Sequence, residues 1–138
     1  MAIIINRVGG GIGADISGID LSRPLDEDTR DMLMRALADH GVVFLPAPER
    51  GGVDVHRQLA LSLGEIAVPH AALASLKDDG APDVGVISTT IGNAYAANCW
   101  HSDVTWKPAP SRYSILHMQV CPQAGGDTMW SSPIVAFA

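Results

Sequence analysis

Basic residues are scarce in this sequence of 138 residues, and those present are scattered singly. Nine Lys and Arg stand against fifteen Asp and Glu, which gives a formal net charge of −6. Nucleic-acid binders displace counterions with clustered basic side chains, and adhesion to an anionic membrane surface needs a similar cluster. We therefore expect neither a nucleic acid nor a membrane among the partners of this protein.

Long apolar runs and cysteines are also few. No stretch approaches the roughly 20 apolar residues of a bilayer-spanning helix. The N-terminal residues, Met1 to Arg7, lack the basic region and long apolar stretch of a signal peptide. The two cysteines, Cys99 and Cys121, form no repeated framework, so we expect reduced thiols. These absences predict a cytoplasmic protein.

Apolar residues are plentiful enough for a packed core. Hydrophobic residues make up 47% of the chain and charged residues 17%, which excludes a disordered composition. The length fits a single domain spanning residues 1–138. Residue patterns predict strands over residues 2–8, 15–21, 42–45, 84–90, 98–106 and 112–120. They predict helices over residues 26–40 and 51–64, a loop with a possible short helix over 69–82, and a turn over 125–128.

The residues that suggest chemistry lie in the stretch Trp100-His101-Ser102-Asp103-Val104-Thr105-Trp106. Residues two apart in a strand face the same side, so His101 and Asp103 could reach one ion. An imidazole and a carboxylate are two members of the 2-His-1-carboxylate triad of Fe(II) oxygenases. The bare triplet is common, and a surface histidine and aspartate on a strand explain it more simply. Its surroundings therefore matter.

Those surroundings resemble the taurine dioxygenase family of Fe(II)/2-oxoglutarate-dependent dioxygenases, in order and in spacing. The matching segments run nearly from end to end of the chain: Gly13 to Ser22, His40 to Phe44, Leu63 to Glu65, Trp100 to Trp106, Pro108, Pro110, Ser114 to Leu116 and Gly125 to Trp130. The resemblance implies an α+β fold. This chain would supply the N-terminal portion of it, a partial double-stranded β-helix (jelly-roll) with flanking helices.

The resemblance also implies roles for individual residues. His101 and Asp103 match the first two iron ligands, with no catalytic residue beyond the metal ligands. Thr128 matches the threonine that hydrogen-bonds the carboxylate of 2-oxoglutarate. The candidate substrate contacts are His70, Asn98, Val104 and Trp106. The family's substrate-binding asparagine falls at Ala97, beside Asn98, which departs from the pattern expected for taurine itself.

The implied protein is an enzyme that uses Fe(II), 2-oxoglutarate and O₂. It would hydroxylate a small, acidic, organosulfur-like substrate and release succinate and CO₂. A carboxylate at Asp103 favours hydroxylation, because related halogenases lack a carboxylate at that position. The family's second histidine ligand and its 2-oxoglutarate arginine belong to a later region. Only His117 follows the motif, and a packed or strand-face histidine is the simpler interpretation there.

Several alternatives accompany this interpretation. We expect a chain that ends before this later region to form a homo-oligomer. The alternative function is a truncated, non-catalytic remnant or an interaction domain. Cys99 shares strand parity with His101 and Asp103, so a zinc site is conceivable, although a small buried thiol is simpler. The glycine-rich Gly9 to Ala14 fits a dinucleotide fingerprint, but the alternating residues after it favour a turn. Trp100, Trp106 and Trp130 are expected in the core, with Trp106 able to border the pocket.

Overall fold

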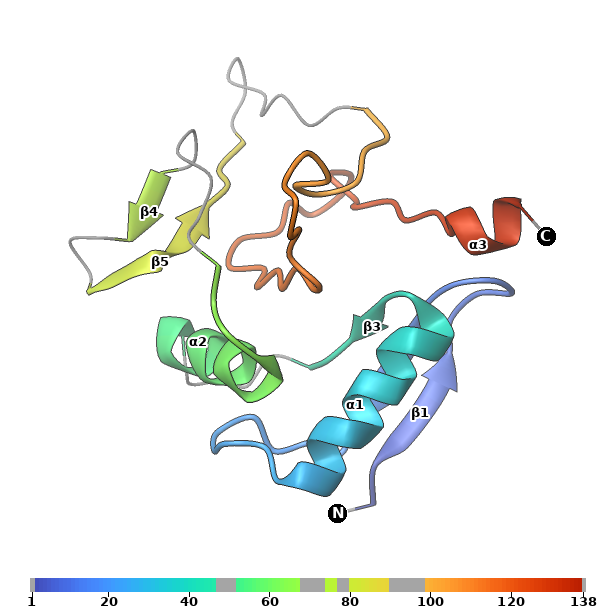
Figure 1. The fold of residues 1–138 in the computed structure, drawn as a ribbon, viewed down its shortest axis with the longest axis horizontal. Coiled ribbons are helices and arrows are strands. Elements are labelled where there is room, and N and C mark those ends of the chain that lie inside the picture. Colours follow the sequence, from blue (N-terminus) through green and yellow to red (C-terminus); the bar gives the residue numbers. More distant parts are fainter. Residues whose placement is uncertain (1, 47–51, 68–73, 77–79, 90–98, 138) are drawn as a thin grey trace. The chain divides into compact units, whose positions relative to one another are not determined.

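The structure is a computed structural model that describes residues 2–46, 52–67, 74–76, 80–89 and 99–137. These residues divide between two compact units. Unit 1 comprises Met1–Leu63 and His117–Ala138, and unit 2 comprises Gly64–Leu116. Figure 1 shows the elements of each unit.

Unit 1 contains a three-stranded sheet in the order β1-β2-β3. β1 (Ile4–Arg7) pairs antiparallel with β2 (Ala14–Ser17), and β2 pairs parallel with β3 (Val43–Phe44). The three predicted strands are confirmed, although β2 ends earlier than residue 21. The reason is Gly18, whose φ of +86° turns the chain and where a side chain would run into the carbonyl oxygen of Ala2.

Helix α1 (Glu27–His40) follows the predicted limits closely. Asp26 caps its start, where the carboxylate accepts a hydrogen bond from the backbone N–H of Thr29 at 2.8 Å. Gly41, with a φ of +71°, ends it and donates its N–H to the carbonyl of Leu37. Both caps are local to the sequence, which explains why the helix was predictable.

The core of unit 1 lies between α1 and the sheet. Leu33 and Ala36 of α1 pack with Ile16 of β2, and all three side chains are at most 3% exposed. The second predicted helix is confirmed as α2 (Gly52–Leu63), whose Leu59 and Leu63 pack against this core while remaining partly exposed. A short helix, α3 (Pro133–Ala136), is capped by Ser132. The apolar stripe of α1 is thus buried, whereas that of α2 is only partly covered.

Unit 2 contains a two-stranded antiparallel sheet of β4 (Ala74–Leu76) and β5 (Ala81–Val86). The strand predicted over residues 84–90 therefore begins earlier and ends at Val86. The loop with a possible helix predicted over residues 69–82 is wrong at 74–76, which form β4, and at 81–82, which begin β5. The sequence Ala-Ser-Leu has little β propensity, so pairing with β5 makes it a strand.

The other two predicted strands are wrong within the described residues. Residues 99–106 form no strand, and the backbone instead turns at 103–106, where the N–H of Lys107 bonds to the carbonyl of Val104. Residues 112–120 form no ladder, although Tyr113, Ile115 and His117 alternate as half-buried side chains with exposed neighbours. The two-residue period is therefore present, but a strand also needs a hydrogen-bonding neighbour.

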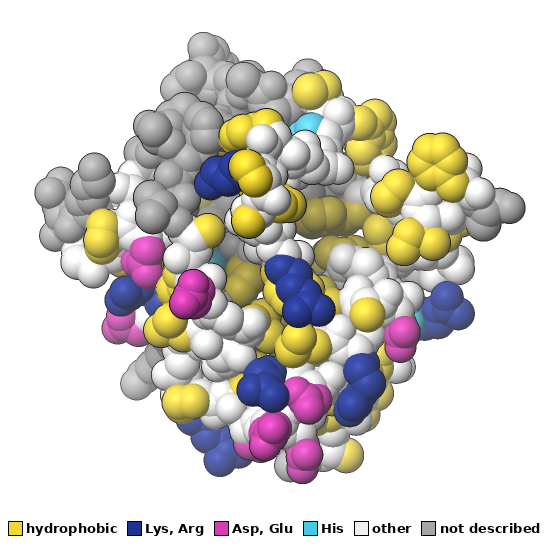
Figure 2. Space-filling model, in the orientation of Figure 1, with side chains coloured by type: hydrophobic (Ala, Val, Ile, Leu, Met, Phe, Trp, Pro, Cys, Tyr) yellow, Lys and Arg dark blue, Asp and Glu magenta, His cyan; other side chains and the backbone are white. Residues whose placement is uncertain are grey.

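The described elements combine helices with small sheets, as an α+β fold requires, and neither sheet closes into a barrel among these residues. Of the helices described, none has the length and apolar character needed to span a membrane. Acidic and basic side chains are intermixed on the face shown in Figure 2. Within α1, Arg30 lies 2.9 Å from Asp31 and 3.7 Å from Glu27.

Candidate functional site

His101 and Asp103 converge in unit 2. Nε2 of His101 lies 3.4 Å from Oδ1 of Asp103, and the two side chains are 50% and 56% exposed. The predicted convergence is therefore present, but its predicted cause, a shared strand face, is wrong. A turn brings the two side chains together instead. Val104 follows Asp103 with a φ of +46°, a left-handed conformation that no other described non-glycine residue adopts. That conformation costs a β-branched residue about 1–2 kcal/mol.

The imidazole of His101 is oriented by the backbone. Its Nδ1 lies 2.8 Å from the carbonyl oxygen of Cys99. A carbonyl oxygen only accepts hydrogen bonds, so Nδ1 carries the proton in this contact. In the neutral ring with this tautomer, Nε2 carries the lone pair on the side that faces Asp103. A histidine that binds a metal through Nε2 uses the same tautomer.

The carboxylate of Asp103 is oriented by a side chain. The hydroxyl of Ser114 donates a hydrogen bond to Oδ2 of Asp103 at 2.7 Å, which leaves Oδ1 facing the imidazole. Sequence reasoning gave Ser114 no role. The signal that could have drawn attention to it was the Ser-Ile-Leu segment, which belongs to the family resemblance. Its distance of eleven residues from Asp103 hid the contact.

The pair fits a divalent ion of the first transition row. Imidazole and carboxylate ligands bind such ions at about 2.1 Å, which places their donor atoms about 3.0 Å apart at a right angle and about 3.4 Å at the tetrahedral angle. The observed 3.4 Å lies at the wide end of that range. Among the residues that the structure describes, no group of three or more His, Cys, Asp or Glu could hold an ion. The pair is therefore a candidate for two ligands of an open site, not for a closed one.

Of the remaining predicted site residues that the structure describes, Val104 and Trp106 belong to unit 2 with the pair, and Thr128 belongs to unit 1. His70 and Asn98 lie outside the described residues. Val104 is half-buried at the turn, and Trp106 is 67% exposed. Thr128 is exposed in unit 1, just after Gly125 and Gly126, whose φ values are +75° and +73°. The turn predicted over residues 125–128 is not present as such, because the chain bends at residues 123–124 instead.

The three tryptophans and His117 differ in how far they are buried. Trp100 and Trp106 are each 67% exposed and Trp130 is 43% exposed, so the expectation of core aromatics is wrong for these described residues. Within unit 1, the His117 ring meets that of His56 edge-on at 5.9 Å between ring centres. His117 is half-buried, which agrees with the interpretation of a packed histidine.

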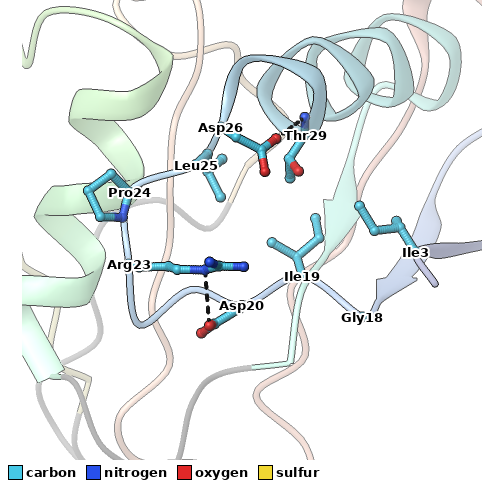
Figure 3. A pocket seen from close by; sticks show the side chains of 9 residues that line it. All are labelled: Ile3, Gly18, Ile19, Asp20, Arg23, Pro24, Leu25, Asp26 and Thr29. Carbon is cyan, nitrogen blue, oxygen red and sulfur yellow. Dashed lines mark hydrogen bonds and ion pairs between the residues drawn. The ribbon is translucent and has the colours of Figure 1, made fainter. Parts of the chain in front are cut away.

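A separate recess of about 550 Å³ lies in unit 1 beside the start of α1 (Figure 3). It is lined by Ile3, Gly18, Ile19, Asp20, Arg23, Pro24, Leu25, Asp26 and Thr29. Arg23 lies 3.2 Å from Asp20. Hydrogen bonds from Ser22, and then the charge of Arg23, lower the pKa of Asp20. Asp26 is engaged as the helix cap, so the recess holds charges already paired and none of the predicted site residues.

Comparison with known proteins gives this geometry a family context. A family model described as taurine catabolism dioxygenase TauD, TfdA family, matches residues 5–136. An alkylsulfatase of Acinetobacter baylyi is 33% identical over 133 residues, which cover 96% of this chain and 40% of that protein. An alpha-ketoglutarate-dependent sulfate ester dioxygenase of Pseudomonas putida is 34% identical over 133 residues, which cover 96% of this chain and 42% of that protein.

Among solved structures, AAD-2 in complex with Mn(II) and N-oxalylglycine overlaps 55% of this chain and 28% of its own, at 20% identity and a TM-score of 0.45. The chain spans about two fifths of the length of the two curated relatives. The family model matches nearly all of it, from residue 5 to residue 136. The family resemblance seen in the sequence is thus confirmed, and the chain belongs to the TauD/TfdA family.

Proposed function

We propose that this chain carries part of the active site of an Fe(II)/2-oxoglutarate-dependent dioxygenase acting on a small anionic organosulfur compound. The observation that carries the proposal is the convergence of His101 Nε2 and Asp103 Oδ1 at 3.4 Å, each held by a hydrogen bond on its other side. An imidazole and a carboxylate with open positions around them suit Fe(II), whereas closed sets of four ligands suit structural zinc.

In this proposal His101 and Asp103 hold the iron, and Thr128 donates a hydrogen bond to a carboxylate of 2-oxoglutarate. Fe(II) with 2-oxoglutarate supplies the oxidation of a C–H bond by O₂, with succinate and CO₂ as products. The neutral imidazole and the single carboxylate leave a net positive charge on a bound ion. That charge favours an anionic co-substrate. Asp103 also occupies the position at which a carboxylate favours hydroxylation.

The substrate class follows from the relatives and from charge. One relative is named as a sulfate ester dioxygenase and the other as an alkylsulfatase. A sulfate ester or sulfonate is therefore the substrate class that we propose here, with His70, Asn98, Val104 and Trp106 as candidate contacts. Ala97 stands where the family's substrate-binding asparagine would fall, so an alkyl sulfate ranks ahead of taurine. A cytoplasmic location, a partial jelly-roll and a homo-oligomer belong to the same proposal.

Anaerobic titration with Fe(II) and 2-oxoglutarate tests the proposal. A completed chelate gives a weak visible charge-transfer band, which we expect from the full chain. We expect His101→Ala and Asp103→Ala to weaken iron binding by about 100-fold or more, since even residues that only support metal ligands contribute 10–100-fold. The matched controls His40→Gln and Asp54→Asn, in α1 and α2, should retain the band. A band that survives Asp103→Ala at full strength would disprove the assignment.

A second candidate function is an interaction domain without catalysis. It is favoured by the shortage of ligands, because the described residues bring no third His, Cys, Asp or Glu to the pair. Large apolar side chains such as Val120, Ile134 and Phe137 are also 78–92% exposed. Iron binding without 2-oxoglutarate-dependent succinate release, from any alkyl sulfate or sulfonate tested, would favour this second function.

A further inference from the structure

The two oxygens of the Asp103 carboxylate have different partners. Oδ2 accepts the hydrogen bond of the Ser114 hydroxyl at 2.7 Å, and Oδ1 lies 3.4 Å from Nε2 of His101. A distance of 2.7 Å is within the short range of charge-assisted O–H···O⁻ bonds. We propose that Ser114 is a positioning residue that holds Oδ2 so that Oδ1 alone is presented to a metal ion beside His101.

The need for such a residue follows from the rotation of a carboxylate. The terminal torsion of aspartate is broad, so an unheld carboxylate turns easily between its two oxygens. Asp103 is 56% exposed, and the close packing that fixes a buried side chain is reduced there. The Ser114 hydroxyl removes that freedom by engaging one oxygen. A carboxylate held in this way offers a single oxygen and leaves the neighbouring positions of the ion to other ligands.

The imidazole of His101 is oriented in the same manner as the carboxylate of Asp103. The Cys99 carbonyl engages Nδ1 of His101 and so presents Nε2, as Ser114 engages Oδ2 and so presents Oδ1. Each atom that would bind the metal is thus positioned by a hydrogen bond at the other nitrogen of the imidazole or the other oxygen of the carboxylate. The turn at Val104, closed by the Lys107 N–H, fixes the backbone between the two side chains. The pair is therefore oriented by contacts within unit 2.

This inference rests on the proposed metal site, and Co(II) is a suitable probe because its d–d absorption reports the ligands directly. The full chain is titrated with Co(II) alone, as the wild type and as the variants Ser114→Ala and Ser114→Thr. We expect Ser114→Ala to weaken Co(II) binding by about 10–100-fold, the usual effect of losing a group that orients a ligand. We expect its d–d bands to change shape, and Ser114→Thr, which keeps the hydroxyl, to restore both affinity and bands.

Ser111→Ala is the matched control, because Ser111 is an exposed serine three residues earlier on the same segment. It should bind Co(II) as the wild type does. If Ser114 were merely structural, Ser114→Ala would lower the thermal midpoint and leave the d–d bands of its bound fraction unchanged. If Ser114→Ala fails to fold, Ser114→Cys takes its place, because a thiol is of similar size but is a weaker hydrogen-bond donor than the hydroxyl. An unchanged affinity in that variant would overturn the proposal.

The two possible failures are distinguishable. A wild-type chain that binds no Co(II) overturns the proposed metal site, and the role of Ser114 with it. A wild-type chain that binds Co(II) with the same affinity and bands as Ser114→Ala overturns the role of Ser114 alone. In that second case the assignment of His101 and Asp103 still stands.

Discussion

Nδ1 of His101 lies 2.8 Å from the carbonyl oxygen of Cys99, two residues earlier in the chain. The contact belongs to the backbone of Cys99, so its side chain is not required for it. The contact holds the imidazole with Nε2 toward Asp103, which is the basis of the metal assignment. The Cys-x-His-x-Asp pattern can be interpreted as an iron site of His101 and Asp103 or as a zinc site that also uses the Cys99 thiol. The role of the Cys99 side chain distinguishes the two.

Replacing Cys99 with alanine should leave metal binding unchanged. The carbonyl that orients His101 is retained in Cys99→Ala, and the dissociation constant for Co(II) is expected to stay within about twofold of the wild type, since a surface change away from special contacts is nearly neutral. The measurement is a Co(II) titration followed by absorbance, in which thiolate ligation adds intense near-ultraviolet bands. Such bands in the wild type, lost in Cys99→Ala, would favour the zinc interpretation instead.

Replacing Thr128 with alanine should weaken the binding of 2-oxoglutarate by about 10–100-fold. A hydrogen bond to a charged group contributes about 1.5–3 kcal/mol, and every 1.4 kcal/mol is a factor of ten. Thr128→Ser keeps the hydroxyl and should bind nearly as the wild type does. The measurement is a 2-oxoglutarate titration at saturating Fe(II) without oxygen, with the exposed Thr89→Ala as the control. Equal dissociation constants for wild type and Thr128→Ala would rule out the assigned contact.

Replacing Leu33 with alanine should lower the free energy of unfolding by about 2–5 kcal/mol, because it opens a cavity between α1 and the sheet. Leu33 is 1% exposed, whereas Leu61 of α2 is 61% exposed. Leu61→Ala is therefore the matched control, and it should change the free energy of unfolding by about 0.5 kcal/mol or less. Urea unfolding followed by circular dichroism measures both. Similar losses from the two variants would contradict the core described for unit 1.

The helix cap at Asp26 should make the folded state less stable at acidic pH. Hydrogen bonds from Thr29 lower the pKa of Asp26 below its ordinary value of 3.8. A carboxyl whose pKa is lower in the folded state stabilises that state above its unfolded pKa, and the contribution is lost as the pH falls through the folded pKa. The thermal midpoint of the wild type should therefore decline below about pH 4. Asp26→Asn keeps a capping oxygen without a titrating group, so it should decline less over the same range.

The matched comparison for that experiment is Asp54→Asn in the first turn of α2. It removes a carboxylate without removing a cap, so it should leave the acid-dependent decline of the wild type in place. Parallel declines in wild type and Asp26→Asn would show that the cap does not contribute to the acid sensitivity.

Much of the fold of unit 1 was predictable because its signals are local. The cap at Asp26, the glycine at Gly41 and the apolar stripe through Leu33 lie within one helix and its ends. The alternating residues of β2 likewise matched a half-buried strand. The predictions failed where the local pattern was weak or where it lacked a partner. β4 exists because β5 pairs with it, and residues 112–120 have the period of a strand without a ladder among the described residues.

The family, the capped helix α1 and the choice of His101 and Asp103 as candidate metal ligands could all be predicted before the fold was known. These depend on residue type and on short spacing, which the chain carries wherever it folds. The folded chain was needed to show that a turn at Val104 brings the two side chains together and that the Ser114 hydroxyl bonds to the Asp103 carboxylate. Those contacts depend on a strained backbone angle and on a contact between residues eleven apart, and local residue propensities predict neither.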